Sequence, residues 1–194
     1  MQDPRIVGAF VQSESSKYLH LTVPYLVGNG VDCGSGGWPV VPWAIQIEQP
    51  AEAFEHYTNG RHVPSTVGWL GDIANLPFKD NTLDWVYSSH LIEDFPHRDV
   101  PERPEVPSWT RLFKEWARCL KPGGVIVILV PDKELWAAAI ERGQPPNCCH
   151  WAPEPSVGDI TEIGQDCGLT VVEDRLTKLD WKDYSILGVL RKPL

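Results

Sequence analysis

The sequence predicts an α/β protein built on a doubly wound, mostly parallel, seven-stranded sheet. Short apolar runs alternate along the chain with amphipathic helical patterns, which is the order that such a sheet requires. A glycine-rich turn follows an early strand signal, as in nucleotide-binding sheets of this class. The length of 194 residues suits one domain with a full core.

The strand and helix signals can be placed along the chain in order. Seven runs read as strands, at residues 30–33, 44–48, 67–71, 83–88, 125–130, 169–175 and 185–191. Three segments have helical periodicity, at residues 107–120, 133–142 and 157–167. We expect residues 1–16 to form a flexible lead-in and residues 17–194 to form the single domain.

The helix predicted over 107–120 has a clear apolar stripe and a clear end. Its stripe is formed by Leu112, Phe113, Trp116, Ala117 and Leu120. The following Lys121-Pro122-Gly123-Gly124 stops the helix and turns the chain into the next strand, because proline cannot extend a helix and glycine suits its end.

The connection between the first two strands is unusually short. Six residues, Trp38 to Trp43, lie between Gly37 and Ala44, and two of them are prolines. A parallel crossover through a helix needs about a dozen residues, and prolines disfavour a regular helix. The sequence therefore predicts that the first crossover helix is absent or reduced to one turn.

Charge and hydropathy exclude some classes of function. The formal net charge is −9, and Lys and Arg are not clustered as polyanion binding requires, so we expect no nucleic-acid partner. No basic leader precedes an apolar run and no stretch approaches the roughly 18 apolar residues of a membrane span. We expect a cytoplasmic protein without a membrane partner, whose five cysteines are reduced.

The turn after the first strand signal has the composition of a nucleoside pocket. It reads Gly30-Val31-Asp32-Cys33-Gly34-Ser35-Gly36-Gly37, and Glu48 closes the next apolar run. Glycines let the backbone approach a ligand closely, and an acid at the end of the next strand can accept hydrogen bonds from a ribose diol.

Further motifs follow in a fixed order, and together they carry a resemblance. They are the segments 71–78 (GDIANLPF), 81–93 (NTLDWVYSSHLIE) and 112–124 (LFKEWARCLKPGG), with the apolar run 125–130. From about residue 17 to the C-terminus the chain resembles the class I S-adenosylmethionine-dependent methyltransferases, of the methyltransferase type 11 kind. The resemblance implies a Rossmann-like fold, S-adenosylmethionine as cofactor and S-adenosylhomocysteine as product.

The resemblance also implies which residues bind the cofactor. They are Asp32, Gly34, Ser35, Gly36, Glu48, Asp72, Ile73, Ser88 and Ser89. In the family, an acid like Asp32 engages the amino group, one like Glu48 holds the ribose hydroxyls, and one like Asp72 accepts from the adenine amino group. Structural alternatives remain open: Asp32 capping its own turn, Glu48 as a solvated strand end, and Asp72 as a helix N-cap.

Two candidates for catalysis follow the fourth strand. His90 lies at the carboxyl end of that strand, where open sheets place ligands, and is a candidate for positioning or deprotonating the nucleophile. A purely structural histidine is the alternative. On a helix Glu93 and Asp94 would face the same side as His90. Asp94 stands where many relatives carry His, and we retain it as a second candidate.

The acceptor is expected to be a small molecule or a sugar. Methyl transfer from a sulfonium is an in-line displacement that depends mainly on positioning, and a base is needed only for a protonated, weakly nucleophilic acceptor. Two proline-rich segments, 95–107 and 144–153, are expected to shape the acceptor site. The run Cys148-Cys149-His150 lacks the usual ligand spacing, so no metal is expected.

Two other classes of protein are weighed against this hypothesis. A degenerate methyltransferase fold that serves as a binding or scaffold module would agree with the short crossover and with Asp94. A nicotinamide-dependent oxidoreductase would need a third glycine, and Pro39 occupies that place.

Overall fold

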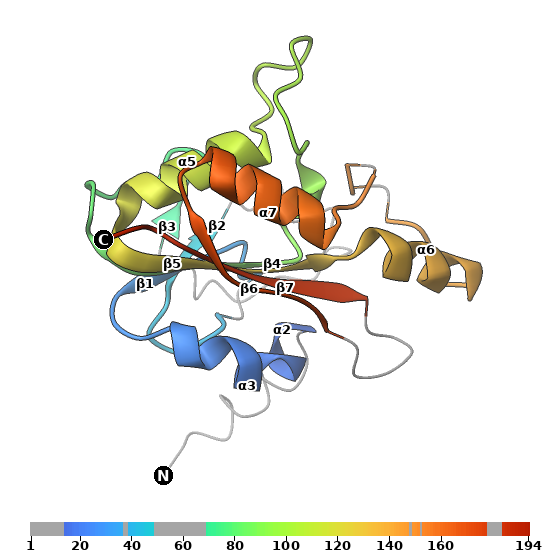
Figure 1. The fold of residues 1–194 in the computed structure, drawn as a ribbon, viewed down its shortest axis with the longest axis horizontal. Helices are drawn as coiled ribbons and strands as arrows, with labels where there is room; N and C mark the ends of the chain where they lie inside the picture. Colours follow the sequence, from blue (N-terminus) through green and yellow to red (C-terminus); the bar gives the residue numbers. More distant parts are fainter. Residues whose placement is uncertain (1–13, 37–38, 49–68, 148, 152, 178–183) are drawn as a thin grey trace.

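A computed structural model describes residues 14–36, 39–48, 69–147, 149–151, 153–177 and 184–194. In these residues the strands form one sheet in the order β3-β2-β1-β4-β5-β7-β6 (Figure 1). The strands are β1 (Gly30–Cys33), β2 (Ile45–Glu48), β3 (Trp69–Leu70), β4 (Leu83–Ser89), β5 (Leu120–Pro131), β6 (Thr170–Thr177) and β7 (Ser185–Arg191). Six strands run in the same direction, and β7 is antiparallel to both of its neighbours, β5 and β6.

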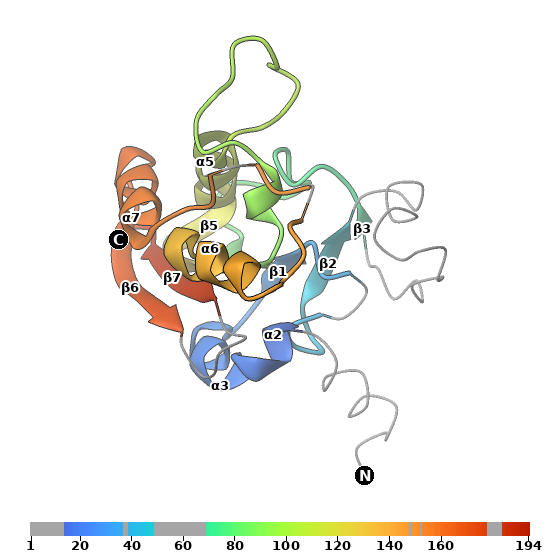
Figure 2. The same ribbon diagram turned by 90° about the vertical axis from the view of Figure 1, so that its right-hand side faces the viewer.

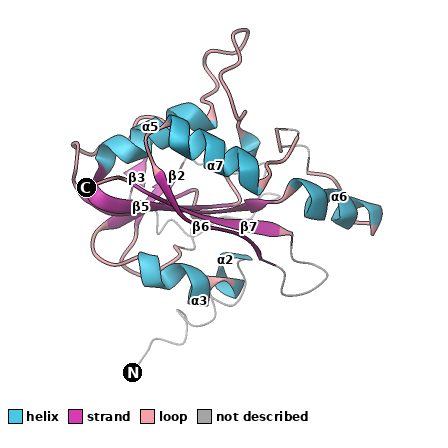
Figure 3. Cartoon of the chain, viewed as in Figure 1, coloured by secondary structure: helices cyan, strands magenta, loops and turns pink. Residues whose placement is uncertain are grey.

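Helices cover both faces of the sheet, as a doubly wound fold requires. Figure 1 shows α5 and α7 above the sheet and α2 and α3 below it, and Figure 3 shows the same layers by secondary structure. The α-helices are α2 (Glu14–Lys17), α3 (Leu19–Thr22), α5 (Trp109–Cys119), α6 (Lys133–Glu141) and α7 (Val157–Asp166), and the 3-10 helices are η1 (Val23–Tyr25) and η2 (Ile92–Asp94). The predicted fold class is confirmed.

The upper layer contains the larger core. Leu112, Phe113 and Trp116 of α5 are fully buried against the sheet, together with Ile160 of α7. These side chains recur every three or four residues, so one face of each helix is apolar. Ser108 caps α5 by accepting a hydrogen bond from the backbone N–H of Arg111, and a capping box of Ser156 and Asp159 begins α7.

The lower layer replaces the missing crossover helix. The described residues between β1 and β2 form no helix, as predicted. Val40 and Val41 from this connection are instead buried beside Tyr18 and Leu26, which come from the N-terminal segment. The N-terminal helical turns therefore cover the face of the sheet that a crossover helix would otherwise fill.

The glycines after α5 do more than end a helix. The helix stops at Cys119 as predicted, but β5 begins immediately at Leu120. The pairing of β4 with β5 jumps from Leu83–Leu120 to Trp85–Val125, so the intervening residues form a bulge. The expectation of a simple turn before the strand is wrong because Gly123 and Gly124 exchange backbone hydrogen bonds with Lys192, which holds them in the sheet.

The remaining segment predictions differ mainly at their ends. Each of the three predicted helices and seven predicted strands has a counterpart: β1 and β7 have the predicted bounds, and the ends of the others differ by up to five residues where the structure describes them. Of the predicted lead-in, residues 14–16 belong to α2 and residues 1–13 lie outside the described part. No described helix is long and apolar enough to cross a membrane.

Candidate functional site

The strand order places a ligand site at the carboxyl ends of β1 and β4. These strands pair with each other, and β2 follows on the other side of β1, so the order reverses at this point. Doubly wound sheets bind ligands in the crevice outside such a reversal. Figure 2 looks toward this edge of the sheet, with α6 in front.

The loop after β1 has the backbone that its glycines allow. Gly34 and Gly36 have φ angles of +75° and +60°, in the left-handed region that residues with a side chain rarely adopt. A Cβ atom on Gly34 would lie 2.7 Å from Cδ2 of Leu91. The loop therefore packs directly on the segment that follows β4.

Glu48 faces this loop rather than solvent. Its side chain is buried, and its Oε1 accepts a hydrogen bond from the backbone N–H of Gly36. The hydroxyl of Ser35 lies 3.1 Å from the same oxygen and 2.9 Å from Oε1 of Gln46. The alternative of a solvated strand end is therefore wrong for Glu48.

Asp32 is buried beneath the same loop. Its Oδ2 accepts a hydrogen bond of 2.6 Å from the backbone N–H of Val40, so it fixes the short connection to β2. Burial raises the pKa of Asp32 from its ordinary 3.8 to about 8; the Val40 amide opposes this shift and the nearby Glu48 carboxylate adds to it. The carboxyl thus has a structural role, but its hydrogen-bond donor is the amide of Val40, eight residues away, and not the backbone of its own turn as the alternative interpretation supposed.

Asp72 begins a turn, not a helix. Its Oδ1 accepts a hydrogen bond of 2.7 Å from the backbone N–H of Ala74, and its carbonyl accepts from Asn75. No helix starts among the described residues that follow it, so the N-cap alternative is wrong in that form. The neighbouring Ile73 is buried, and its carbonyl accepts a hydrogen bond of 2.9 Å from Nε1 of Trp116, which anchors the turn to α5.

Ser88 and Ser89 end β4 beside the glycine loop. Ser88 pairs with Cys33 in the parallel ladder between β1 and β4. The hydroxyls of both serines are buried and have no hydrogen-bond partner within the described part of the chain. Buried hydroxyls are normally satisfied, so these two are donors and acceptors available to a ligand.

His90 directly follows β4 and has a strained backbone. Its φ angle is +51°, which is uncommon for a residue with a side chain and occurs often at functional sites. Its backbone N–H donates to the carbonyl of Leu129, so the strain is held by the sheet. Nε2 of His90 lies 3.4 Å from the hydroxyl of Ser185, and the ring is edge-on to Tyr184.

The acidic partner of His90 is Glu93. Nδ1 of His90 lies 3.3 Å from Oε1 of Glu93, whose side chain is 1% exposed. The segment forms a 3-10 helix, η2, in which residues three apart align. Asp94, the next residue, is half-buried.

Sequence reasoning missed His150 as a site residue. Nε2 of His150 lies 3.9 Å from Oε1 of Glu93, and Nδ1 lies 3.0 Å from Oε1 of Glu154. The predicted acceptor segment 144–153 does reach the site through this residue. Only the spacing of His90 and Glu93 signals part of this cluster in sequence, because the loop with His150 is brought in by the fold.

The loop is not filled by Trp43. This side chain is 56% exposed, and its Nε1 donates to the carbonyl of Leu26, 3.4 Å away. Gly37, Trp38 and Cys148 lie outside the described residues. Within the described ranges no group of three His, Cys, Asp or Glu side chains has the geometry of a metal site.

The chemistry of this edge fits a nucleoside with a charged amino-acid tail. It offers a buried acid facing a glycine loop, a second buried acid below it, and two unsatisfied hydroxyls. The fold is thus a Rossmann-like domain, and this polar edge lies where its strand order reverses.

Comparisons with known proteins show what the chain is similar to. A family model described as a methyltransferase domain matches residues 44–128. None of the curated proteins matches the chain in sequence. This part of the chain is thus similar to methyltransferase domains, and the solved structures that share its fold include S-adenosylmethionine-dependent methyltransferases.

Solved structures share the fold at low sequence identity. An S-adenosylmethionine-dependent methyltransferase from Mesorhizobium loti has a TM-score of 0.64 and 15% identity, with 94% of this chain and all of that chain covered. One from Methanosarcina mazei has a TM-score of 0.60 and 17% identity, with 90% and 97% covered. A chain in a complex between a Haloferax volcanii methyltransferase activator and a methyltransferase has a TM-score of 0.59 and 18% identity, with 99% and 95% covered.

Proposed function

We propose that this chain is an active enzyme that transfers the methyl group of S-adenosylmethionine to a small-molecule or sugar acceptor by in-line displacement. The burial of Glu48 against the glycine loop carries the proposal, because a carboxylate kept there is positioned for a ribose diol. The net charge of −9 favours an acceptor that is not a polyanion. The domain of 17–194 and a cytoplasmic location remain part of the proposal.

The cofactor residues have separate roles in this proposal. Gly34, Ser35 and Gly36 line the ribose and methionine portions, and Glu48 accepts from the ribose hydroxyls. Asp32 faces the ammonium group of the cofactor, which a carboxylate binds strongly.

The other end of the cofactor meets β3 and β4. Asp72 accepts from the adenine amino group and the N–H of Ile73 serves a ring nitrogen. Ser88 and Ser89 supply the hydroxyls that have no partner within the described chain. The cofactor itself supplies an electrophilic methyl group, and these residues only bind and orient it.

Calorimetry with S-adenosylhomocysteine tests the proposal. We expect micromolar binding to the wild type and a loss of about 10- to 100-fold in Glu48→Ala, since a charge-assisted bidentate contact is worth about 1.5–3 kcal/mol. Glu141→Ala, which removes an exposed acid from α6, is the matched control and should bind like wild type. Absence of heat with both S-adenosylmethionine and S-adenosylhomocysteine would contradict the proposal.

His90 and Asp94 remain the proposed catalytic residues. His90 is supported by its strained backbone at the end of β4 and by its 20% exposed side chain. Asp94 is supported only by its position in the family motif. Single-turnover rates of His90→Asn and Asp94→Asn separate the two, because a residue that acts only in the chemical step lowers the rate without changing cofactor affinity.

A scaffold without activity is the second candidate. It is favoured by the fact that the acids at the site already accept hydrogen bonds from the protein. Asp32 accepts one from the backbone N–H of Val40, and Glu48 accepts one from that of Gly36. Cofactor that remains bound through purification, or methylated product from a pooled metabolite screen, would exclude this candidate.

A further inference from the structure

A chain of polar side chains crosses the edge of the sheet beyond β4. It runs from Glu154 to His150, then to Glu93, His90 and Ser185, with successive separations of 3.0, 3.9, 3.3 and 3.4 Å. We refer to these five residues as the His–Glu relay. It joins η2, the loop after α6 and the start of β7.

Backbone hydrogen bonds fix each part of the relay. The N–H of Trp151 donates to the carbonyl of Glu93 over 2.7 Å, which ties the loop after α6 to η2. The N–H of Asp132 donates to the carbonyl of Tyr184, which ties the start of α6 to the start of β7. The relay is thus built from rigid contacts between elements.

Glu93 is the unusual member of the relay. It is 2% exposed, and neither of its oxygens has a hydrogen-bond partner within the described residues. A buried carboxylate is costly unless a charge or a donor satisfies it. The nitrogens that face it belong to His90 and His150, so one of these two rings must present an N–H to the carboxylate.

The end of the relay lies beside the cofactor loop. Leu91, the residue after His90, is the side chain that a Cβ on Gly34 would meet. The side chain of His90 is 20% exposed. A molecule that borders the glycine loop therefore has access to the ring of His90.

We propose that the acceptor is a hydroxyl compound, that His90 accepts its proton at Nε2, and that Glu93 and His150 are positioning residues that keep the proton of the neutral His90 ring on Nδ1. This inference rests on the proposed function and names the acceptor class for it. A base is useful when the nucleophile arrives protonated and weakly nucleophilic, as an alcohol does. Nε2 of His90 already lies 3.4 Å from a hydroxyl, that of Ser185.

The step balances in atoms and electrons. The acceptor O–H bond breaks and its proton passes to Nε2 of His90, while an oxygen lone pair forms the new O–C bond. The S–C bond of the sulfonium breaks with its electron pair left on sulfur, which gives S-adenosylhomocysteine. The positive charge lost from sulfur is regained as the imidazolium of His90, which the buried Glu93 stabilises.

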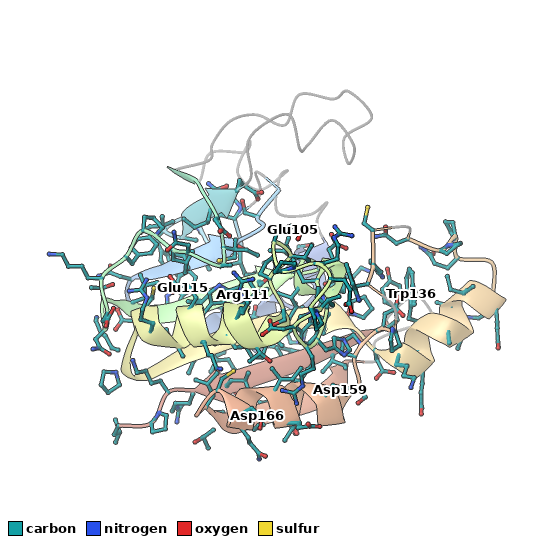
Figure 4. The ribbon with its side chains drawn as sticks, turned by 90° about the horizontal axis from the view of Figure 1, so that it is seen from above. Glu105, Arg111, Glu115, Trp136, Asp159 and Asp166 are labelled. Carbon is teal, nitrogen blue, oxygen red and sulfur yellow. The ribbon has the colours of Figure 1, made fainter. Side chains whose placement is uncertain are left out.

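Aromatic rings pack beside the relay. Tyr184 is edge-on to His90 and 4.8 Å from the ring of Trp136 on α6, which in turn lies 5.1 Å from the ring of His150. Figure 4 shows Trp136 on α6, set apart from the charged side chains of α5 and α7. Trp136 is buried in this cluster, so the rings pack behind the relay and support it.

The tautomer of His90 tests the relay directly. Imidazole ¹⁵N shifts of the full chain, at a pH where the ring is neutral and with S-adenosylhomocysteine present, should show the proton on Nδ1. The signal is assigned by its loss in His90→Asn, since asparagine tolerates the left-handed backbone. A proton on Nε2 in the wild type would overturn the proposal without any variant.

Two further variants test whether Glu93 and His150 set the tautomer of His90, as opposed to a general effect of substitution. Glu93→Gln and His150→Phe should each lower the ratio of the Nδ1–H to the Nε2–H form several-fold, whereas Glu141→Gln should not. The ring of His97, which packs on Trp109, is an internal control and should keep its shifts. An unchanged ratio in both relay variants would overturn the positioning role.

Cofactor binding in the same samples distinguishes a failure of the relay from a failure of the proposed function. If S-adenosylhomocysteine binds but His90 has the other tautomer, only the relay fails. If the wild type shows no binding heat at all, the proposed function fails as well.

The acceptor class has its own test. Protein and ¹³C-methyl S-adenosylmethionine are incubated with a panel of methyl glycosides and phenols and with matched amino sugars and anilines. We expect an O-methyl signal that falls about 10²-fold or more in His90→Asn while affinity for S-adenosylhomocysteine is retained. Methylation of nitrogen alone, or no methylated hydroxyl in the panel, would overturn the assignment of the acceptor.

Discussion

Oδ2 of Asp32 accepts a hydrogen bond of 2.6 Å from the backbone N–H of Val40, across the shortened connection between β1 and β2. In place of a crossover helix, the fold uses one buried carboxyl to hold this short stretch of chain. The same carboxyl is the group that the proposed function assigns to the cofactor ammonium. The Val40 amide and the cofactor ammonium would therefore both use the carboxyl of Asp32. Its protonation should affect both the free energy of unfolding and cofactor binding, and both can be measured.

The free energy of unfolding should fall as the pH rises toward 8. The pKa of Asp32 is raised from 3.8 to about 8 by burial, so between these values the unfolded chain has released a proton that the native state still holds. Stability is then fully present below pH 4 and declines up to about pH 8, by at most about 1.4 kcal/mol per pH unit. Urea unfolding of wild type and Asp32→Asn at several pH values measures this.

The comparison of the two proteins isolates the contribution of Asp32. Asparagine keeps an oxygen for the Val40 amide but cannot ionise. The free energy of unfolding of Asp32→Asn should therefore decline less steeply with pH over the same range than that of the wild type. Equal slopes for the two proteins would contradict the raised pKa.

Binding of S-adenosylhomocysteine near pH 7 should release up to about one proton. Asp32 is largely protonated in the free protein at this pH, because its pKa is about 8, and the ammonium group of the ligand favours the carboxylate. Calorimetry in buffers of different ionisation enthalpy measures the release. It should disappear in Asp32→Asn, and proton uptake by the wild type would rule out a contact between Asp32 and the ammonium.

The sequence alone predicts the sheet and the position of Glu48 beside the glycine loop, for physical reasons. Strand periodicity and the position of Glu48 after an apolar run are local, and a parallel sheet brings the ends of neighbouring strands together. The bulge at Gly123 and Gly124 was not predictable in this way, because it depends on pairing with Lys192, which is distant in the sequence.

The N-terminal layer and the relay were missed for a similar reason. Residues 1–16 were expected to form a loose lead-in and the domain to begin at residue 17. No local pattern shows that Tyr18 and Leu26 are buried where a crossover helix is lacking. Glu93 and His150 are brought together by the loop after α6, and no local pattern marks that contact.

Trp116→Phe should cost about 1–3 kcal/mol of stability, because the carbonyl of Ile73 loses a buried donor. The turn of Asp72 and Ile73 would also loosen, so affinity for S-adenosylhomocysteine should fall several-fold. Trp43→Phe is the same substitution at an exposed site with a longer bond of 3.4 Å, and we expect a change within about 0.5 kcal/mol. Urea unfolding and calorimetry measure both, and equal effects would contradict an anchoring role for Trp116.

Gly34→Ala should destabilise the protein and impair cofactor binding together. An added Cβ would meet Leu91 at 2.7 Å, in a backbone conformation with a φ angle of +75°. Gly143 has a φ angle of +97°, and a Cβ added there would meet no atom within 4 Å, so Gly143→Ala carries the backbone cost alone, about 1–2 kcal/mol.

The difference in stability between Gly34→Ala and Gly143→Ala measures how closely the glycine loop packs on Leu91. Overpacking adds about 1–3 kcal/mol to Gly34→Ala, and Leu91→Ala in the same chain should recover part of that addition by removing the clashing methyl groups. Urea unfolding gives the stabilities and calorimetry with S-adenosylhomocysteine gives the affinities. If Gly34→Ala were no worse than Gly143→Ala in either measurement, the glycine loop would not pack on the segment after β4, and the acceptor side of the site would have to lie elsewhere.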